Sequence, residues 1–361
     1  METLILEESE VQEAFFERGW TDGLPIVPPT PDRVRLMMQA AGLEPDEPLG
    51  SVPARGVIVT VQKAAVNTVM AGCKPEYFPV VVAALSAMLD PQFNVHAAST
   101  STGGAAICVV VSGPLIQEIG LNTGHNALGS GFRANATIGR AVRLVALNVL
   151  RSRPGEMDGS SIGHPGKYTL CIAENPPPEP WEPLRVELGY DQSDTTVTVM
   201  PTEGPRQIGN QLNPDGEGIL RTFAAAIRNP STYSVGKGGQ GILVLGPEHM
   251  QILVEEGWTR KAVRDFLVNH ARITPRELED AGVLLEIGAQ HSISPDEDGK
   301  LPTIPSPEDL FLVTAGGAGA GWSAYLPAWA PKIHAMATTR RVRAAGEALP
   351  DCGPDSCDIP V

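Results

Sequence analysis

The hydrophobic positions of the chain form short continuous runs that alternate with amphipathic segments. Short runs rich in Val, Ile and Leu are typical of strands buried on both faces, whereas apolar residues at helical spacing predict helices. Strands that alternate with helices indicate an α/β fold with largely parallel sheets whose faces are covered. The predicted strands cover residues 57–61, 107–111, 167–175, 196–200, 242–245 and 309–317.

Glycine and proline mark the expected ends of several helices. Residues 8–19 predict one helix, and Pro31 and Gly42 bound a second, because proline suits the first position and glycine the residue after the last turn. Further predicted helices end at Gly72, cover 75–89 and 218–228, and begin near Arg140 and Lys261. The proline-rich run at 176–183 predicts a connector.

One α/β unit occurs twice in this pattern. Residues 107–120 match 242–257, and residues 140–154 match 261–275. The two Gly-Pro pairs lie 133 residues apart and the two Ala-Val-Arg triplets 121 apart, so the first unit carries 12 additional residues, GHNALGSGFRAN. We expect two pseudo-repeated α/β lobes, with function in the loop that only one of them has. Coincidence between two amphipathic helices is the alternative.

This repeat predicts the domain boundaries. A helical and loop segment covers 1–56, the first repeat with its insertion and proline-rich connector covers 57–194, the second repeat covers 195–330, and a tail covers 331–361.

The net charge of −15 over 361 residues narrows the range of partners. Nucleic acid and anionic membranes require basic surfaces, so neither is expected. The acidic N-terminal segment resembles no secretory leader, and no apolar run is long enough to span a bilayer, which predicts a cytoplasmic protein. Five scattered cysteines are too few for a disulfide scaffold and are expected to be mostly thiols.

Several segments resemble an uncharacterised bacterial family that is often encoded beside thioredoxin-like proteins or selenoproteins with a (Sec/Cys)-Gly-Ser-Cys motif. The resemblance covers roughly residues 20–330. It implies that the protein works together with thiol or redox proteins, including a thioredoxin-like partner, but it implies no established reaction. This chain lacks the neighbour's motif, so that chemistry does not transfer to it. The segments are TDGLPIVPPTPDRV, VNTVMAGCKPEYFPVVVAAL, RANATIGRAVRLVALNV, GHPGKYTLCIAEN and LGPEHMQILVEEGWT.

Cys73 is the candidate nucleophile. It lies between the predicted helix end at Gly72 and a helix start at Pro75, beside Lys74. A helix N-terminus and a neighbouring cation both favour the thiolate. The alternative is a small buried residue that fills a corner between helices.

The insertion and the segment after it supply candidate anion-binding residues: His125, Asn126, Arg133 and Asn135. Backbone N–H groups of a glycine loop and of a helix N-terminus bind carboxylate or phosphate, and an arginine can clamp the same anion. The alternative is that the glycines only permit tight turns.

Polar residues around the strand at 167–175 form a second candidate group. His164 is a candidate proton-transfer residue, Lys167 its electrostatic partner, and Glu174 lies at the carboxyl end of the strand, where ligand sites of α/β proteins cluster. His164 as a simple turn cap is an equal alternative.

A second glycine-rich segment, at 315–323, predicts further ligand contacts. Gly316 and Gly317 follow a predicted strand and can present backbone donors, while Ser323 can line a pocket. Asp22 is a candidate orienting group for a histidine or lysine, although an Asp-Gly turn explains it as well.

Together these residues predict an enzyme for a small anionic substrate, with thiol-based redox, acyl-transfer or carbon–heteroatom cleavage chemistry. The alternatives are a non-catalytic ligand-binding or scaffold subunit, and a metal-dependent hydrolase or lyase using His96, His125 and His164. No cofactor class follows from the sequence. Cys352 and Cys357 lack the spacing of a zinc knuckle, so no metal is assigned. Self-association remains open, because the apolar helix around 80–89 is explained equally by core packing.

Overall fold

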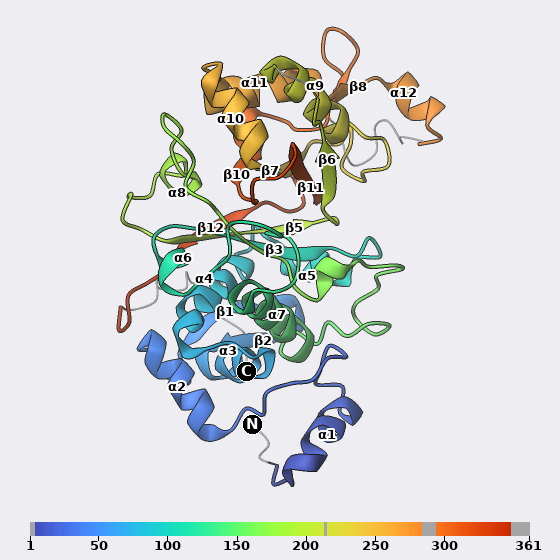
Figure 1. Ribbon diagram of the computed structural model, residues 1–361. Helices are drawn as coiled ribbons and strands as arrows, with labels where there is room; N and C mark the ends of the chain where they lie inside the picture. The colour runs from blue at the N-terminus through green and yellow to red at the C-terminus, as the bar shows by residue number, and fades with distance from the viewer. Residues whose placement is uncertain (1–3, 213–214, 284–293, 348–361) are drawn as a thin grey trace.

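The computed structural model describes residues 4–212, 215–283 and 294–347, which form a mixed α/β fold (Figure 1). Its main sheet has eight strands. They are β3 (Ala106–Ser112), β4 (Cys171–Ala173), β5 (Thr196–Thr202), β6 (Arg206–Gly209), β7 (Gly239–Leu245), β10 (Leu310–Thr314), β11 (Trp322–Pro331) and β12 (Thr338–Arg341). The order is β10-β7-β11-β5-β3-β4, with β12 beside β5 and β6 beside β11.

The main sheet is mixed rather than largely parallel. Only β3 with β4 and β7 with β10 run parallel among the described strand pairs of this sheet. In both pairs helices lie between the two strands in the chain, as a parallel crossover requires. The predicted strands at 107–111, 167–175, 242–245 and 309–317 form these parallel pairs. The predicted strand at 196–200 is β5, but it runs antiparallel to β3, and β11, which runs antiparallel to β7, was not predicted.

The two halves of the sheet face each other, which the sequence did not predict. Cys108 and Val110 of β3 share one buried cluster with Ile242 and Val244 of β7, although β3 and β7 are not neighbours in the sheet. Residues alternate between the faces of a strand, so the intervening positions of each half point outward. Each half therefore needs helices on one face only, because the other half covers its second face.

Helices cover the two outer faces, giving four layers (Figure 1). On the half formed by β3 and β5 lie α2 (Pro31–Ala41), α3 (Val61–Ala71), α4 (Phe78–Met88), α5 (Val95–Thr100) and α7 (Arg133–Asn148). On the half formed by β7 and β10 lie α9 (Gly216–Ile227), α10 (Pro247–Glu255) and α11 (Arg260–His270). Shorter helices are α1 (Val11–Glu17), α6 (Leu115–Glu118), α8 (Leu184–Glu187) and α12 (Pro275–Asp280).

The ends of the described chain are part of the fold. Phe15 of α1 and Val34 and Met37 of α2 belong to the same buried core as α3, α4 and α7. The predicted tail contributes β12, which pairs with β5. The predicted strand at 57–61 is β2 (Val57–Thr60), which forms a hairpin with β1 (Pro48–Val52) outside the main sheet. The other small sheet pairs β8 (Arg272–Ile273) with β9 (Leu301–Pro302).

Helix ends follow the glycine and proline positions. Helix α2 begins at Pro31 and ends before Gly42, whose φ of 64° is left-handed, and α3 ends before Gly72 with a φ of 91°. The segment at Pro75 is a 3-10 turn (Pro75–Tyr77) that leads into α4. In the described part of the chain, none of the helices combines the length and apolar character needed to cross a membrane.

Candidate functional site

A cavity of about 440 Å³ lies at the carboxyl ends of β7 and β10, and we call it the insertion cavity. One wall is the insertion, from His125 to Gly129, which belongs to the first half of the chain. The opposite wall comes from the second half and includes the first turn of α10, Gly316 and Gly317, and Ser323 at the start of β11. Carboxyl ends of parallel strands and helix N-termini are the usual ligand positions of α/β folds.

Five of the predicted substrate-binding residues meet at this cavity. They are His125, Asn126, Gly316, Gly317 and Ser323. The insertion thus lies against the second glycine-rich segment, although about 190 residues separate them in the chain.

Asparagine side chains hold the insertion in place. The Asn135 amide accepts from Asn122 N (2.8 Å) and donates to Asn122 O (3.1 Å), and Asn122 Nδ2 donates to His125 O (2.9 Å). Asn126, at a left-handed φ of 60°, donates to Ser130 O (2.6 Å) and closes the loop. Asn135, predicted to bind the substrate, is buried and positions His125 through Asn122.

Glycine permits close approach of the two walls at Gly317. A Cβ at this position would overlap the His125 ring, whereas a Cβ at Gly319 would meet open space. Gly316 N donates to Thr123 O (2.8 Å) and ties the two glycine-rich segments together. Gly317 therefore lets the His125 imidazole lie at the cavity wall.

Glu248, on the first turn of α10, places a carboxylate at the cavity. Its Oε1 accepts from Gly319 N (2.5 Å). Desolvation raises the pKa of this partly buried carboxyl, but backbone N–H groups of Gly319, Glu248 and Gly321 outweigh it and hold the pKa below its usual range. A carboxylate of the chain itself thus occupies a backbone donor of the glycine-rich segment.

Ser323 is hydrogen-bonded to a buried histidine. Its Oγ lies 2.8 Å from His249 Nδ1 and accepts from Gly246 N at 3.1 Å. His249 Nε2 lies 2.9 Å from Asn210 O, and burial lowers the pKa of His249.

Cys73 lies outside the insertion cavity, in a closed corner between α3 and α7. Burial raises the pKa of its thiol to about 12, and a hydrogen bond with Thr137 and the charges of Arg133 and Arg140 offset this only in part. The predicted activating cation, Lys74, instead pairs with Glu76 (3.6 Å). The local argument from a helix end omitted the cost of burying a thiolate, so the alternative, a corner-filling cysteine, describes this position.

Arg133 and Asp22 also belong to this corner. Arg133 donates Nε (3.0 Å) and an Nη (2.9 Å) to Gly72 O, and thereby satisfies the end of α3. Asp22 accepts two hydrogen bonds of 2.8 Å from Arg140 and does not orient a histidine or lysine. Neither Arg133, predicted to clamp the anion, nor Asp22 is among the residues that line the insertion cavity.

His164 and Lys167 lie in another closed cluster. Lys167 Nζ contacts both carboxylate oxygens of Asp158 (2.9 and 2.7 Å), which also pairs with Arg143 (2.8 Å). Although burial opposes ionisation, contacts with Lys167 and Ser160 lower the pKa of Asp158 to about 2. His164 Nδ1 accepts from Gly166 N (3.2 Å), so His164 caps a turn, as the alternative predicted.

Glu174 is buried at the end of β4 and acts within the fold. Its carboxylate accepts from the hydroxyl of Ser112 and from Leu184 N (3.0 Å), at the start of α8. Burial raises the pKa of Glu174 despite these bonds and the charges of Arg260 and Arg185. None of the predicted catalytic residues Cys73, His164, Lys167 and Glu174 lines the insertion cavity.

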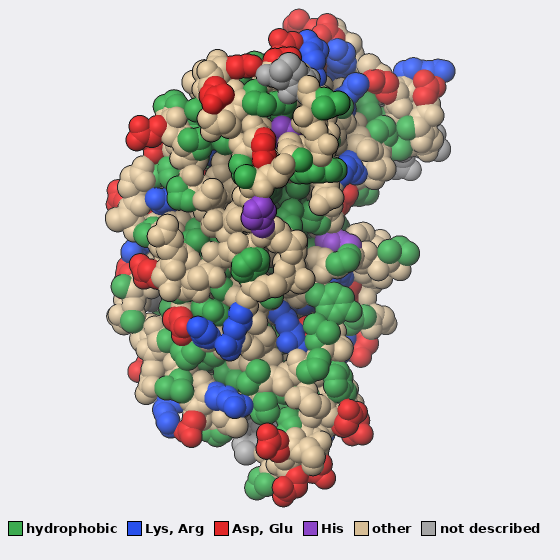
Figure 2. Space-filling model, viewed as in Figure 1, with side chains coloured by type: hydrophobic (Ala, Val, Ile, Leu, Met, Phe, Trp, Pro, Cys, Tyr) green, Lys and Arg blue, Asp and Glu red, His purple; other side chains and the backbone are tan. Residues whose placement is uncertain are grey.

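Charge is distributed unevenly over the surface. On the face shown in Figure 2, acidic side chains are spread over the upper and lower parts, whereas Lys and Arg form small separate groups. One cationic cavity of about 390 Å³ includes Lys63, Arg151, Asn67 and Asn148 in its lining. The described residues contain no group of three or more potential metal ligands, so His96, His125 and His164 do not converge.

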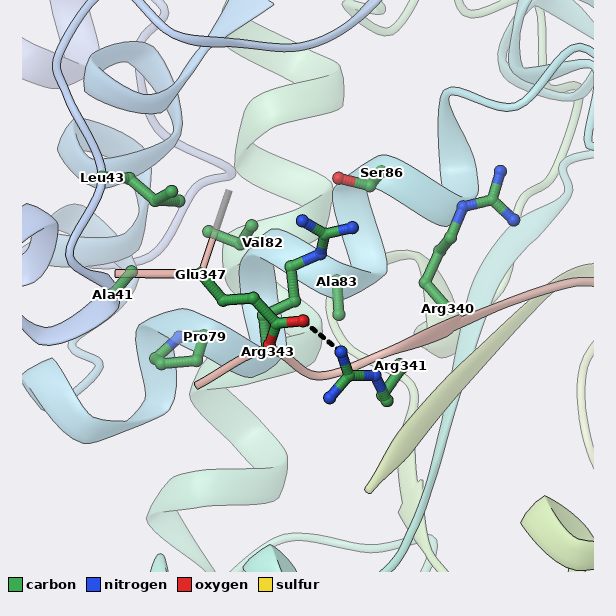
Figure 3. Close-up of a pocket in the computed structure, with 10 residues that line it drawn as sticks. All are labelled: Ala41, Leu43, Pro79, Val82, Ala83, Ser86, Arg340, Arg341, Arg343 and Glu347. Atoms are coloured by element: carbon green, nitrogen blue, oxygen red, sulfur yellow. Dashed lines mark hydrogen bonds and ion pairs between the residues drawn. The ribbon is translucent and has the colours of Figure 1, made fainter. Parts of the chain in front are cut away.

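A third cavity lies among α2, α4 and the residues after β12 (Figure 3). Arg340 and Arg341 at its wall are paired with Asp90 and Glu347. Its volume is about 80 Å³. Pockets for organic ligands usually hold about 300 Å³ or more, so this cavity is too small for a substrate.

Sequence reasoning missed Glu248 and His249 as site residues. Their segment, LGPEHM, was visible as part of the repeat, and a Gly-Pro step after a buried strand signals a helix N-terminus at a strand's carboxyl end. Comparisons of the chain with known protein families and with curated proteins found no match.

Proposed function

We propose that the protein is an enzyme acting on a small anionic substrate bound in the insertion cavity. The observation that supports this most strongly is the convergence of His125, Asn126, Gly316, Gly317 and Ser323 on one cavity of about 440 Å³. Backbone donors and the N-terminus of α10 favour a negatively charged group there. His125 is proposed to contact the substrate from the cavity wall, whereas His164, to which the sequence gave the proton-transfer role, does not line the cavity.

Glu248 narrows the class of substrate. Its lowered pKa keeps the carboxylate ionised beside the cavity, and like charges in a partly enclosed site repel. We therefore propose a substrate with one negative charge, such as a small monocarboxylate, in preference to a phosphate dianion. The cavity lining contains no Lys or Arg to offset a second charge.

Thiol-based chemistry is less well supported, since the thiol of Cys73 is buried and protonated near neutral pH. A ligand-binding or scaffold subunit for a thioredoxin-like partner is the second candidate, and the buried Cys73 favours it. Under both proposals the protein is cytoplasmic and binds neither nucleic acid nor a membrane. Both are compatible with association of two copies of the chain.

We also propose that the halves of the main sheet derive from one repeated unit. Each half contains a parallel pair, β3 with β4 or β7 with β10, and an antiparallel strand, β5 or β11. The connection within each parallel pair begins with two helices of matching order, α6 and α7 or α10 and α11, and the second connection adds α12 and the β8–β9 pair. The insertion of one unit then completes the cavity of the other.

A ligand screen tests the proposed function. Small monocarboxylates, dicarboxylates and phosphate are titrated while the thermal unfolding midpoint is recorded, and a ligand at 100 times its dissociation constant adds about 2.7 kcal/mol to the free energy of unfolding. We expect monocarboxylates to stabilise the protein and His125→Ala to weaken their binding. Arg151→Ala, in the cationic cavity, is the control. Stabilisation that His125→Ala preserves and Arg151→Ala abolishes would assign the ligand to the other cavity.

A further inference from the structure

The Ser323–His249 pair has the geometry of an activated hydroxyl at the wall of the insertion cavity. Ser323, which is 6 % exposed, lines the cavity from the start of β11, and His249 lies behind it, 1 % exposed, on the first turn of α10. The 2.8 Å separation between Ser323 Oγ and His249 Nδ1 is that of a hydrogen bond.

The surroundings of His249 determine which atom carries the proton. Its Nε2 lies 2.9 Å from the carbonyl oxygen of Asn210, which can only accept, so Nε2 bears the hydrogen. In the neutral ring Nδ1 is then an acceptor, and the Ser323 hydroxyl must donate to it. Burial favours this neutral ring by lowering the pKa of His249, although the neighbouring Glu248 charge and the Asn210 hydrogen bond oppose the shift.

The environment of Ser323 Oγ also favours negative charge. Gly246 N donates to this oxygen at 3.1 Å, and the positive end of α10 begins at the same residue. Gly246, the N-cap residue, makes no side-chain cap to the first turn of α10. A Cβ at Gly246 would overlap Trp322 O, so only glycine allows β11 and α10 to approach closely enough for this contact.

We propose that Ser323 is a nucleophile that accepts an acyl group from a small ester or thioester that carries one negative charge, with His249 as its general base. Ser323 Oγ forms a bond to the carbonyl carbon while its proton passes to His249 Nδ1. Collapse of the tetrahedral intermediate breaks the bond to the alkoxide or thiolate leaving group, which takes the proton from His249. Water then attacks the acyl-serine, with His249 again accepting and returning a proton, and releases the acid.

This inference rests on the proposed function, since it names the reaction at the same cavity. Asn210 O would also stabilise the transient imidazolium, as an acceptor for its Nε2–H. The scheme consumes only the acyl compound and water.

Acylation by p-nitrophenyl acetate and labelling by a fluorophosphonate test the proposal, with the modified residue identified by peptide mass spectrometry. We expect one modified serine, Ser323, and no label in Ser323→Ala. His249→Gln should lower the labelling rate by about 10²–10⁴-fold. Ser152→Ala, which alters a buried serine that donates to Ser99 O, is the matched control and should label normally.

The pH profile separates a general base from a structural histidine. Because protonated His249 cannot accept the proton, labelling should decline only below the ordinary histidine pKa of 6.5, and His249→Gln should lack this inflection. Wild-type protein that remains folded and unlabelled at Ser323 under excess reagent would overturn the inference. If small monocarboxylates still stabilise that protein through His125, the proposed binding site stands; if they do not, both proposals fail.

Discussion

The Cys73 corner and the insertion cavity show how differently two groups of candidate residues can be used by one fold. Around Cys73, the polar groups of Asp22, Arg133 and Arg140 are directed at one another or at backbone carbonyls. Around the cavity, the exposed His125 lies at a wall open to a ligand, and the buried Ser323 lines the same wall. The difference teaches that a residue type with suitable chemistry indicates function only when its partners leave a face free for substrate.

The largest effect on stability is expected when the Asp22–Arg140 ion pair beside Cys73 is broken. Asp22→Asn removes the carboxylate that pairs with Arg140, whose side chain is 14 % exposed, and should cost about 3 kcal/mol of unfolding free energy. Asp32→Asn, in an exposed pair with Arg35, should cost less than about 0.5 kcal/mol. Urea unfolding measures both. A loss of ligand binding with unchanged stability in Asp22→Asn would instead make this corner functional.

The second prediction concerns the Lys167 cluster and its pH dependence. The pKa of Asp158 is lowered from 3.8 to about 2 in the folded protein, so its contribution is present above pH 4 and is lost as the pH falls towards 2. This contribution is roughly 2 kcal/mol. The difference in unfolding free energy between wild type and Asp158→Asn should therefore shrink between pH 4 and pH 2. A constant difference over that interval would mean that Asp158 does not titrate there.

Secondary structure was the part of the fold that local sequence signals predicted best. Pro31 marks a helix start because proline fixes a helical φ angle. Gly42 and Gly72 mark helix ends because glycine adopts the left-handed conformation that follows the last turn. Strand β11 was missed because Pro327 and Pro331 break the strand pattern. The facing half-sheets were missed because a continuous apolar run indicates that a strand is buried on both faces. It does not indicate whether a helix or another sheet covers each face.

The candidate site was predicted in part for a similar reason. The glycine-rich segments are local signals, and both contribute to the insertion cavity. The Ser323–His249 hydrogen bond joins residues 74 positions apart, and no spacing rule predicts such a contact. The burial of Cys73 likewise depends on packing by distant helices, which a single helix end does not reveal.

The third prediction tests the cavity by a pair of glycine substitutions. Gly317→Ala places a methyl group where the His125 ring lies, and should weaken ligand binding about tenfold, equivalent to about 1.4 kcal/mol, as the exposed ring moves away. Gly319→Ala adds the same methyl group to open space and should bind normally. Binding is measured by calorimetry with the best monocarboxylate of the screen. Equal effects of both substitutions on ligand affinity would show that binding does not depend on where the His125 ring lies.

The smallest effect is expected at Cys73 itself. Cys73→Ala should cost about 1 kcal/mol of stability and leave ligand binding and turnover unchanged, because the side chain only fills a buried corner. With its pKa raised to about 12, the Cys73 thiol should resist iodoacetamide at pH 7–9 and react once the protein unfolds. Peptide mass spectrometry after native and denatured labelling measures this. Native labelling near pH 7 together with loss of turnover in Cys73→Ala would reverse the comparison, because a thiolate can form there only if the corner opens and admits solvent.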